Sequence, residues 1–541
     1  MKNFAIEVIN FLKRNKVFTI TILIAIILSY GYIVVNQSVH VDDTSFNRYY
    51  EEEYFLAQGR FIPVLLHKIT GAFQYAPFWL NALSSIVLFF ATTIWSMLLK
   101  KASKDKLSIT AINIFGLIFV TYPLINEIFI YMGAALLISL GYLLTAISIM
   151  LFNKYREENK YKYLFLNIIL NCCILAIYES FAVVYICGVL MTLILEYLNS
   201  DTKLTFIKLL KDIFFVFISL VVPLIIKTII VSLIIKPFCN PDIPNYAANK
   251  ITWRTIPFID NFKKLVLDLI NKYMLSGVRY LPILMYALAL GFSFIISIGM
   301  SIKKKNINIF ILFVGLVIST ILLSLVQGSV SPYRTCQVFA IFVAFIFMIL
   351  FSIVEKDTLL KNIMLFIVII IVLNQSRDLS QWFYLNGARY DYEKTVASNI
   401  GTELEKVNID NKPIVFIGSA KCPKWILEFE ATKMPIAEKV VTKVIRVFPK
   451  AIEDEYAKVL NQYRPNQNNS GSLFSSWATV AFGEVNTEYF KFLSMHGYTF
   501  NQGSKEQLGL AWSLQKDMEG YPRDGYIYDA GEFYIINMGS I

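Results

Sequence analysis

The chain has 541 residues, of which 56% are hydrophobic, and its formal net charge is +11. Soluble domains are about 45–50% apolar even by a count that includes glycine, so this composition excludes an ordinary soluble protein and indicates a polytopic helical membrane protein. The three histidines lack the spacing of zinc ligands, and neither a G-x-x-x-x-G-K-[ST] nor a G-x-G-x-x-G motif occurs. The sequence therefore gives no support for a zinc centre or a nucleotide-binding fold.

Apolar runs long enough to cross a bilayer recur along the first 376 residues. A span needs roughly 20 apolar residues. On that rule we predict about eleven transmembrane helices, near residues 17–35, 79–99, 108–126, 128–152, 164–181, 182–198, 213–236, 281–301, 308–327, 336–354 and 361–375. The first run has no small-residue cleavage site, so we interpret it as an anchor rather than a signal peptide.

The excess positive charge lies in short loops between these runs. Basic residues near the ends of spans keep a loop in the cytoplasm, and alternating the spans from a cytoplasmic N-terminus puts every basic cluster on that side. The charge thus orients the chain in a membrane and requires no nucleic acid partner. The clusters are Lys13, Arg14 and Lys16; Lys100, Lys101, Lys104 and Lys106; Lys154, Arg156 and Lys160; Lys203, Lys208 and Lys211; Lys303, Lys304 and Lys305; and Lys356 and Lys361.

Three segments are then predicted to lie outside the cell: loop 36–78, loop 237–280, and everything after about residue 376. The last segment has a mixed, globular composition. KPIVFIG (412–418) is typical of a buried strand that ends in a turn, and GYIYDAGEFYIINM (525–538) is typical of a hairpin. We therefore predict a transmembrane domain, 1–376, followed by an extracytoplasmic α/β domain, 377–541.

The opening loop contains the stretch HVDDTSFNRYYEEEYFLAQGRF, residues 40–61. An aspartate before an amphipathic helix is a good N-cap, and a helix lying on the membrane would explain the other charges. A cap needs only one carboxylate, however, and Asp42 and Asp43 are adjacent. Their repulsion raises the pKa of one of them toward a range suited to proton abstraction. Asp43 directly precedes Thr44 and is the better placed cap, which favours Asp42 as the base, but both stay candidates.

Other polar residues are predicted at the outer ends of spans. Glu127 follows the third span, and Glu179 lies in the apolar run AIYESFAVV. Ionisable groups at membrane depth are functional candidates by default; for Glu179 the alternative is an ordinary turn between two spans. Arg334, in GSVSPYRTCQ, faces outward, where an arginine fork matches the geometry of a phosphate. The alternative is an arginine that reaches the interface only to keep its charge in water.

This arrangement resembles the polytopic glycosyltransferases of the GT-C type, and more closely the bacterial type II O-antigen glucosyltransferases. The resemblance lies in the order of short motifs relative to the spans. These are the Asp42-Asp43 pair after the first span with the following Arg48, Gly59-Arg60 near the end of that loop, the outward Pro332-Tyr333-Arg334, and the α/β tail with its VFIG strand. Glu127 and Glu179 match no motif of that family and rest on their membrane placement alone.

The resemblance implies a polyprenyl-phosphate-linked sugar, typically glucose, as donor and a cell-surface glycan as acceptor, in the bacterial plasma membrane. Asp42 or Asp43 would deprotonate the acceptor hydroxyl. Arg60 and Arg334 would bind the donor phosphate, with Arg48 a further phosphate-binding candidate. Tyr333 is a candidate through its place beside Arg334. The sugar would invert at its anomeric carbon. A divalent metal at the acidic pair is left open, and no other cofactor is implied.

Two other classes of function compete with this interpretation. A transporter or flippase for lipid-linked glycans would bury charges at mid-membrane, often in repeated halves, whereas the sequence shows few mid-span charges and no internal repeat. A non-catalytic membrane scaffold would have no use for both carboxylates of the Asp42-Asp43 pair.

Overall fold

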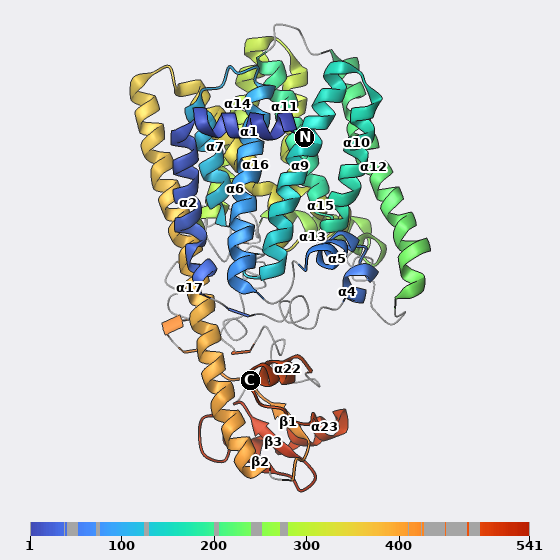
Figure 1. The fold of residues 1–541 in the computed structure, drawn as a ribbon, viewed down its shortest axis with the longest axis vertical. Coiled ribbons are helices and arrows are strands. Elements are labelled where there is room, and N and C mark those ends of the chain that lie inside the picture. The colour runs from blue at the N-terminus through green and yellow to red at the C-terminus, as the bar shows by residue number, and fades with distance from the viewer. Residues whose placement is uncertain are drawn as a thin grey trace. The chain divides into compact units, whose positions relative to one another are not determined.

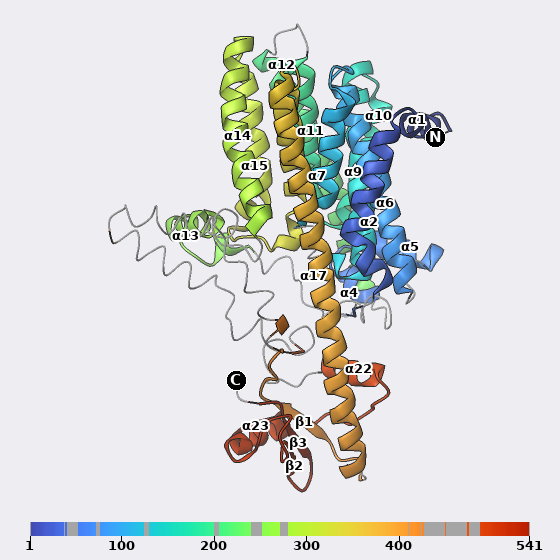
Figure 2. The same ribbon diagram turned by 90° about the vertical axis from the view of Figure 1, so that its left-hand side faces the viewer.

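Long apolar helices form most of the first of two units into which the chain divides. In the computed structural model these units are Met1–Val35 with Ser45–Gln381, and Asn36–Thr44 with Trp382–Ile541. The structure describes residues 2–36, 38–39, 52–71, 76–123, 129–199, 205–239, 251–270, 280–408, 410–423, 425–426, 450, 473–474 and 487–539. Figures 1 and 2 show the ribbon in two orientations.

Nine helices in the described part of the chain are long and apolar enough to cross a membrane. The protein is therefore a polytopic helical membrane protein. The helices are α2 (Lys16–Val35), α6 (Pro77–Ala102), α9 (Met132–Glu158), α11 (Phe181–Leu198), α12 (Phe206–Ile229, continued by the π-helix η3, Ile230–Ile235), α14 (Tyr280–Lys304), α15 (Ile307–Gln327), α16 (Gln337–Val354) and α17 (Thr358–Val407).

Two of the eleven predicted spans coincide with shorter helices. The predicted span 108–126 contains α7 (Ile109–Thr121), which has 13 residues, and 164–181 overlaps α10 (Tyr161–Ile177), which has 17. At a rise of 1.5 Å per residue both fall short of a hydrocarbon core about 30 Å thick. The count of eleven spans therefore stays a prediction.

The helices differ in how much of their surface the protein itself covers. In an apolar stretch of 18 residues, 78% of the residues of α16 and 72% of those of α11 are buried, whereas the figure is 17% for such a stretch in the span that contains α12 and in α17. In lipid an apolar helix needs no protein cover for its side chains, but its polar groups need partners. Two polar side chains in the bundle have such partners: Asn167 Nδ2 donates to Ser148 O at 2.9 Å, and Trp95 Nε1 donates to Tyr142 O at 3.0 Å. Thus α11 and α16 form the centre of the bundle.

The two ends of the bundle have different character. The basic clusters gather at one end, where Lys106 Nζ donates to Asn199 O and Ser108 Oγ donates to Glu355 Oε2; we call it the basic end. The short helices α4 (Glu52–Ala57) and α5 (Phe61–Thr70) lie at the other end, opposite the N-terminal helix α1 (Lys2–Arg14) (Figure 1). We call this the Arg60 end.

Helix α13 (Phe258–Ile270) also lies at the Arg60 end, across the direction of α14 and α15 (Figure 2). The 3-10 turn η6 (Thr252–Arg254) precedes it and anchors it to the end of α15. In this turn Trp253 Nε1 donates to Leu325 O at 2.8 Å. The part of the predicted loop 237–280 that contains η6 is thus held at the end of α15.

The second unit contains a three-stranded sheet in the order β1-β3-β2, in which β1 (Ile414–Ile417) runs parallel to β3 (Tyr534–Asn537) and β2 (Ile527–Asp529) is antiparallel to β3. These strands confirm the predicted buried strand and hairpin. Alternate residues of β1 pack on opposite faces, where Val415 joins a core with Leu508 of α23 (Lys505–Leu514) and Phe416 contacts the ring of Tyr489 on α22 (Thr487–Met495). That this unit is an extracytoplasmic domain stays a prediction.

Helix α17 has 50 residues and continues from the first unit into the second. Its first part contains the predicted last span, 361–375. The predicted domain boundary at 376–377 lies inside this helix.

Candidate functional site

An ion cluster at the Arg60 end centres on the turn between α10 and α11. α10 ends at Ile177 and α11 begins at Phe181, so Glu179 lies in the intervening turn. Its Oε1 lies 2.5 Å from Nζ of Lys227, and its Oε2 lies 3.8 Å from Nε of Arg60. The Arg60 guanidinium carbon also lies 4.6 Å from the ring centroid of Tyr178. The turn therefore holds two cations from two other elements, the α4–α5 connection and α12.

Lys227 is the member of this cluster that the sequence analysis missed. It lies in the predicted span 213–236, and its side chain is 8% exposed. A charge in that position is tolerated only with partners; besides Glu179, its Nζ donates to Leu175 O at 3.0 Å. The signal was present, because an ionisable residue inside VVPLIIKTIIVSLII is a functional candidate by itself.

The charge on Glu179 follows from its neighbours. Burial disfavours the charged carboxylate and by itself would raise its pKa, but Lys227 and then Arg60 outweigh that effect, so the pKa of Glu179 lies below its usual value of 4.5. Glu179 is thus ionised at neutral pH. Its contacts place it to hold two cations.

Gly59 has a backbone conformation that brings Arg60 to this cluster. Its φ of +74° is left-handed, and a Cβ at this position would lie 2.9 Å from Cε of Lys227 and 3.1 Å from Cγ2 of Val231. Any side chain would therefore be strained and would displace Lys227. The predicted Gly59-Arg60 motif thus has a geometric basis: glycine allows the close approach, and Arg60 becomes the residue that precedes α5.

The surroundings of Arg60 favour an anion. It is the N-cap residue of α5, where backbone N–H groups and the helix dipole attract negative charge. Its side chain is 25% exposed, and its Nε is buried without a hydrogen-bond partner. Glu179 supplies the one carboxylate within 4.0 Å of Arg60 in the part of the chain that the structure describes, and Lys227 shares it. The Arg60–Glu179–Lys227 cluster thus carries one surplus positive charge.

Arg334 is connected to the same turn through Gln337. Arg334 lies half-buried in a 3-10 turn, η8 (Tyr333–Thr335), directly before α16. The buried Gln337 donates from Nε2 to Arg334 O at 2.6 Å, and its Oε1 accepts from Ser180 Oγ at 2.8 Å. Because Ser180 follows Glu179 in the turn, the structure brings the segments of Arg60, Glu179 and Arg334 to one end of the bundle.

The remaining predicted site residues, Asp42, Asp43, Arg48 and Glu127, lie outside the described residues. Their roles stay predictions. Within the described ranges no group of three His, Cys, Asp or Glu side chains could hold a metal ion. The question of a metal at the acidic pair therefore stays open.

A comparison with protein families matches residues 31–351, more than half of the chain, to Glucosyl transferase GtrII. The chain belongs to this family. The resemblance inferred from the short motifs is confirmed, and this GtrII chain is a membrane glycosyltransferase. A comparison with curated proteins finds no match.

The GtrII match begins inside α2 and ends inside α16. It therefore includes Arg60, Glu179, Lys227 and Arg334, and it excludes α17 and the sheet of the second unit. The family match therefore covers most of the helical bundle, including the turn of Glu179 and the turn of Arg334.

Proposed function

We propose that the protein transfers glucose from a polyprenyl-phosphate-linked donor to a cell-surface glycan on the extracytoplasmic side of a bacterial plasma membrane. The observation that carries this proposal is the cluster of Arg60, Glu179 and Lys227, linked through Ser180 and Gln337 to the backbone of Arg334. It supplies a cationic site at the end of a membrane bundle, which is where a lipid carrier presents its phosphate.

The positive-inside rule supports this sidedness. The basic clusters that gather at one end of the bundle are those that keep loops in the cytoplasm. The Arg60 end then faces outward. The N-terminus is cytoplasmic in this arrangement, and with eleven crossings of GT-C type the second unit is extracytoplasmic, as a platform for the acceptor or a lid over the site.

The chemistry is a single displacement. The acceptor hydroxyl oxygen forms a bond to the anomeric carbon of the donor while the bond from that carbon to the phosphate oxygen breaks, which inverts the anomeric centre. Asp42 or Asp43 takes the hydroxyl proton. Arg60 and Arg334 stabilise the negative charge that grows on the departing polyprenyl phosphate. Glu179 holds Arg60 in place, and Lys227 shares that carboxylate.

Sugar transfer by aspartate variants tests this proposal. Full-length Asp42→Asn and Asp43→Asn would be assayed in membranes with radiolabelled polyprenyl-phosphate glucose, beside Asp105→Asn as a matched control at the basic end. General-base catalysis typically contributes 10²–10⁴-fold, so we expect at least one variant to lose about 100-fold while the control keeps its rate. Wild-type rates in both variants would contradict the assignment of the base.

Two further assays of sugar transfer test which donor the protein uses and whether it requires a metal ion. Nucleotide-linked glucose should give no transfer, because the chain lacks a nucleotide-binding motif. Transfer from that donor in place of the lipid-linked one would reject the proposed substrate. The rate with and without a chelator shows whether a divalent metal takes part.

A further inference from the structure

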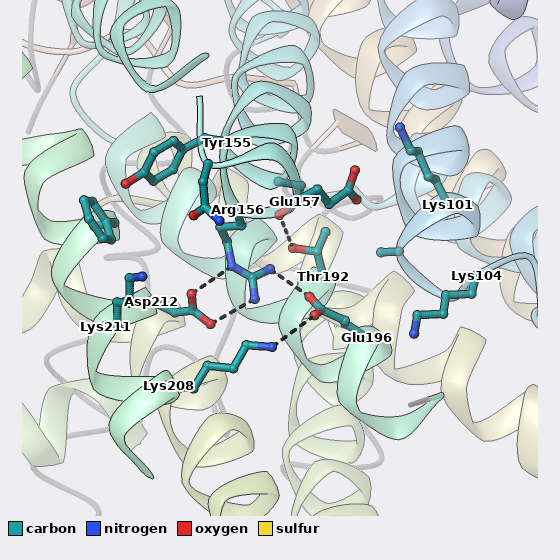
Figure 3. A pocket seen from close by; sticks show the side chains of 14 residues that line it. Lys101, Lys104, Tyr155, Arg156, Glu157, Thr192, Glu196, Lys208, Lys211 and Asp212 are labelled. Carbon is teal, nitrogen blue, oxygen red and sulfur yellow. Dashed lines mark hydrogen bonds and ion pairs between the residues drawn. The ribbon is translucent and has the colours of Figure 1, made fainter. Parts of the chain in front are cut away.

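A polar cavity of about 420 Å³ lies at the basic end, between the ends of α6, α9, α11 and α12 (Figure 3). This volume is within the range of small-molecule sites. The cavity is lined by Glu196 near the end of α11 and Lys208 near the start of α12. Glu179 and Lys227 lie at the opposite ends of these two helices, so the cavity is separate from the proposed site of sugar transfer.

Arg156 forms a fully paired cluster in the lining of this cavity. Its Nε and Nη2 donate to Oδ1 and Oδ2 of Asp212, each at 2.9 Å, and its Nη1 donates to Glu196 Oε2 at 2.8 Å. This fork joins the last turn of α9 to α11 and α12. The one positive charge of Arg156 offsets one of the two carboxylate charges, so this cluster retains one negative charge for the lysines around it.

Four lysines surround the Arg156 cluster, with Lys101 and Lys104 on one side of it and Lys208 and Lys211 on the other (Figure 3). Lys208 Nζ lies 3.9 Å from Glu196 Oε1. Over the described ranges, the other three lysines have no carboxylate within 4.0 Å. Because the only other acidic side chain in the lining is Glu157, the cavity carries surplus positive charge and attracts an anion with more than one charged or polar oxygen.

The same turns of α12 present an apolar surface beside these lysines. Ile207 is 80% exposed, Leu210 is 49% exposed and Phe214 is 58% exposed. The cavity wall itself includes the ring of Phe215, which packs edge-on against Tyr155 with 5.1 Å between centroids. Lysines that alternate with lipid-facing apolar side chains favour an amphiphile over a soluble anion.

We propose that this cavity binds the phosphate headgroup of an anionic phospholipid, with the acyl chains lying along the exposed face of α12. Basic pockets between transmembrane helices are suited to such headgroups. The protein buries little of the surface of α12, and the acyl chains of a bound lipid would cover the exposed apolar side chains of this helix. Because α12 carries Lys227 at its other end, the lipid stabilises the helix whose lysine pairs with Glu179. The binding itself does not depend on which sugar the protein transfers.

Lipid titration of the purified full-length protein tests this inference. The melting temperature in neutral detergent would be followed with phosphatidylglycerol, with phosphatidylcholine of the same acyl chains, and with inorganic pyrophosphate. We expect saturable stabilisation by phosphatidylglycerol alone. Equal stabilisation by both lipids would overturn the headgroup site. Stabilisation by pyrophosphate without any by phosphatidylglycerol would assign the cavity to a soluble anion and reject the lipid.

Paired lysine variants locate the binding. In Lys208→Gln with Lys211→Gln we expect the apparent affinity for phosphatidylglycerol to fall about fivefold for each lysine removed. Lys303→Gln with Lys305→Gln removes the same charge from another basic loop outside the cavity and should keep the affinity. An equal loss in both pairs would reduce the effect to general surface charge and overturn the site.

Lys101→Gln with Lys104→Gln repeats the test from the other side of the cavity. Neither lysine forms an ion pair with Asp212 or Glu196 of the Arg156 cluster. This pair therefore still tests the site if loss of the Lys208–Glu196 contact impairs folding. Unchanged lipid affinity in this second pair would also overturn the proposal.

Discussion

The ammonium of Lys227 lies 2.5 Å from a carboxylate oxygen of Glu179 and ties the last turns of α12 to the turn between α10 and α11. Arg60 keeps only a 3.8 Å contact with the same carboxylate. Glu179 therefore neutralises the charge of Lys227 more completely than it neutralises the charge of Arg60. The Arg60 guanidinium is thus the cation available to an incoming phosphate.

Lys227→Met should weaken both stability and donor binding. Removing one partner of a buried pair leaves the other uncompensated; because Glu179 is 40% exposed and keeps Arg60, we expect a loss of about 2 kcal/mol in the free energy of unfolding. Arg60 should then pair more closely with Glu179, so the KM for the lipid donor should rise. Thermal unfolding in detergent and donor titration measure the two effects.

The double variant Lys227→Met with Glu179→Gln is the control for coupling. If the two residues act as a pair, its loss of stability will be smaller than the sum of the single losses. Additive losses would show that the contact between them has no energetic role.

Gly59→Ala should lower sugar transfer more than stability. Its left-handed φ alone costs an alanine about 1–2 kcal/mol, and the added Cβ displaces Lys227. Gly531→Ala is the matched control, because Gly531 also has a left-handed φ, of +88°, but no atom lies within 4 Å of its Cβ position. Both variants should melt earlier, but only the first should lose transfer. Equal activity of the two at equal folded protein would contradict the role of Gly59.

Gln337→Leu should reduce transfer about tenfold or more, because it releases the backbone of Arg334 from the Ser180 turn. Asn167→Leu removes another buried amide, one that bonds to Ser148 and Tyr185 inside the bundle. Both should be destabilised by about 1–3 kcal/mol through unsatisfied partners. The transfer rates of the two variants would be compared at equal concentrations of folded protein, where only Gln337→Leu should be slower. A similar rate in both variants would mean that Gln337 acts only through stability.

The depressed pKa of Glu179 predicts how stability depends on pH. A group whose pKa is lower in the folded state adds stability above its unfolded value of about 4.5 and loses it as the pH falls through the folded value. The difference in melting temperature between wild type and Glu179→Gln should thus be constant from pH 6 to 8 and shrink below about pH 4.5. A difference that instead grows on acidification would show that the pKa is raised.

The sequence located most helices because in lipid the backbone must satisfy its own hydrogen bonds, so an apolar run of sufficient length becomes a helix. It was less informative about their ends. Hydrophobicity continues past Ile177 into the Glu179 turn, so α10 is shorter than its apolar run. Conversely, α17 continues beyond residue 376 although the composition changes there, because a change in composition does not by itself end a helix.

The candidate site likewise contains residues that the sequence predicted and residues that it did not. Glu179 and Arg334 were predicted because a charge at the end of a span is conspicuous in one sequence, and Arg60 was predicted through the Gly59-Arg60 motif of the family resemblance. Lys227 and Gln337 depend on partners that only packing brings near: Glu179 is 48 residues from Lys227, and Ser180 is 157 residues from Gln337. A single sequence shows the residues but not these pairs.

The KM and kcat for polyprenyl-phosphate glucose in Arg60→Gln test the central claim most directly. A hydrogen bond to a charged group contributes about 1.5–3 kcal/mol, so kcat/KM should fall about 10- to 100-fold. Lys68→Gln on the same helix, whose side chain is 60% exposed, should match the wild type. An unchanged kcat/KM in Arg60→Gln at equal folded protein would contradict the assignment of Arg60 to the donor phosphate.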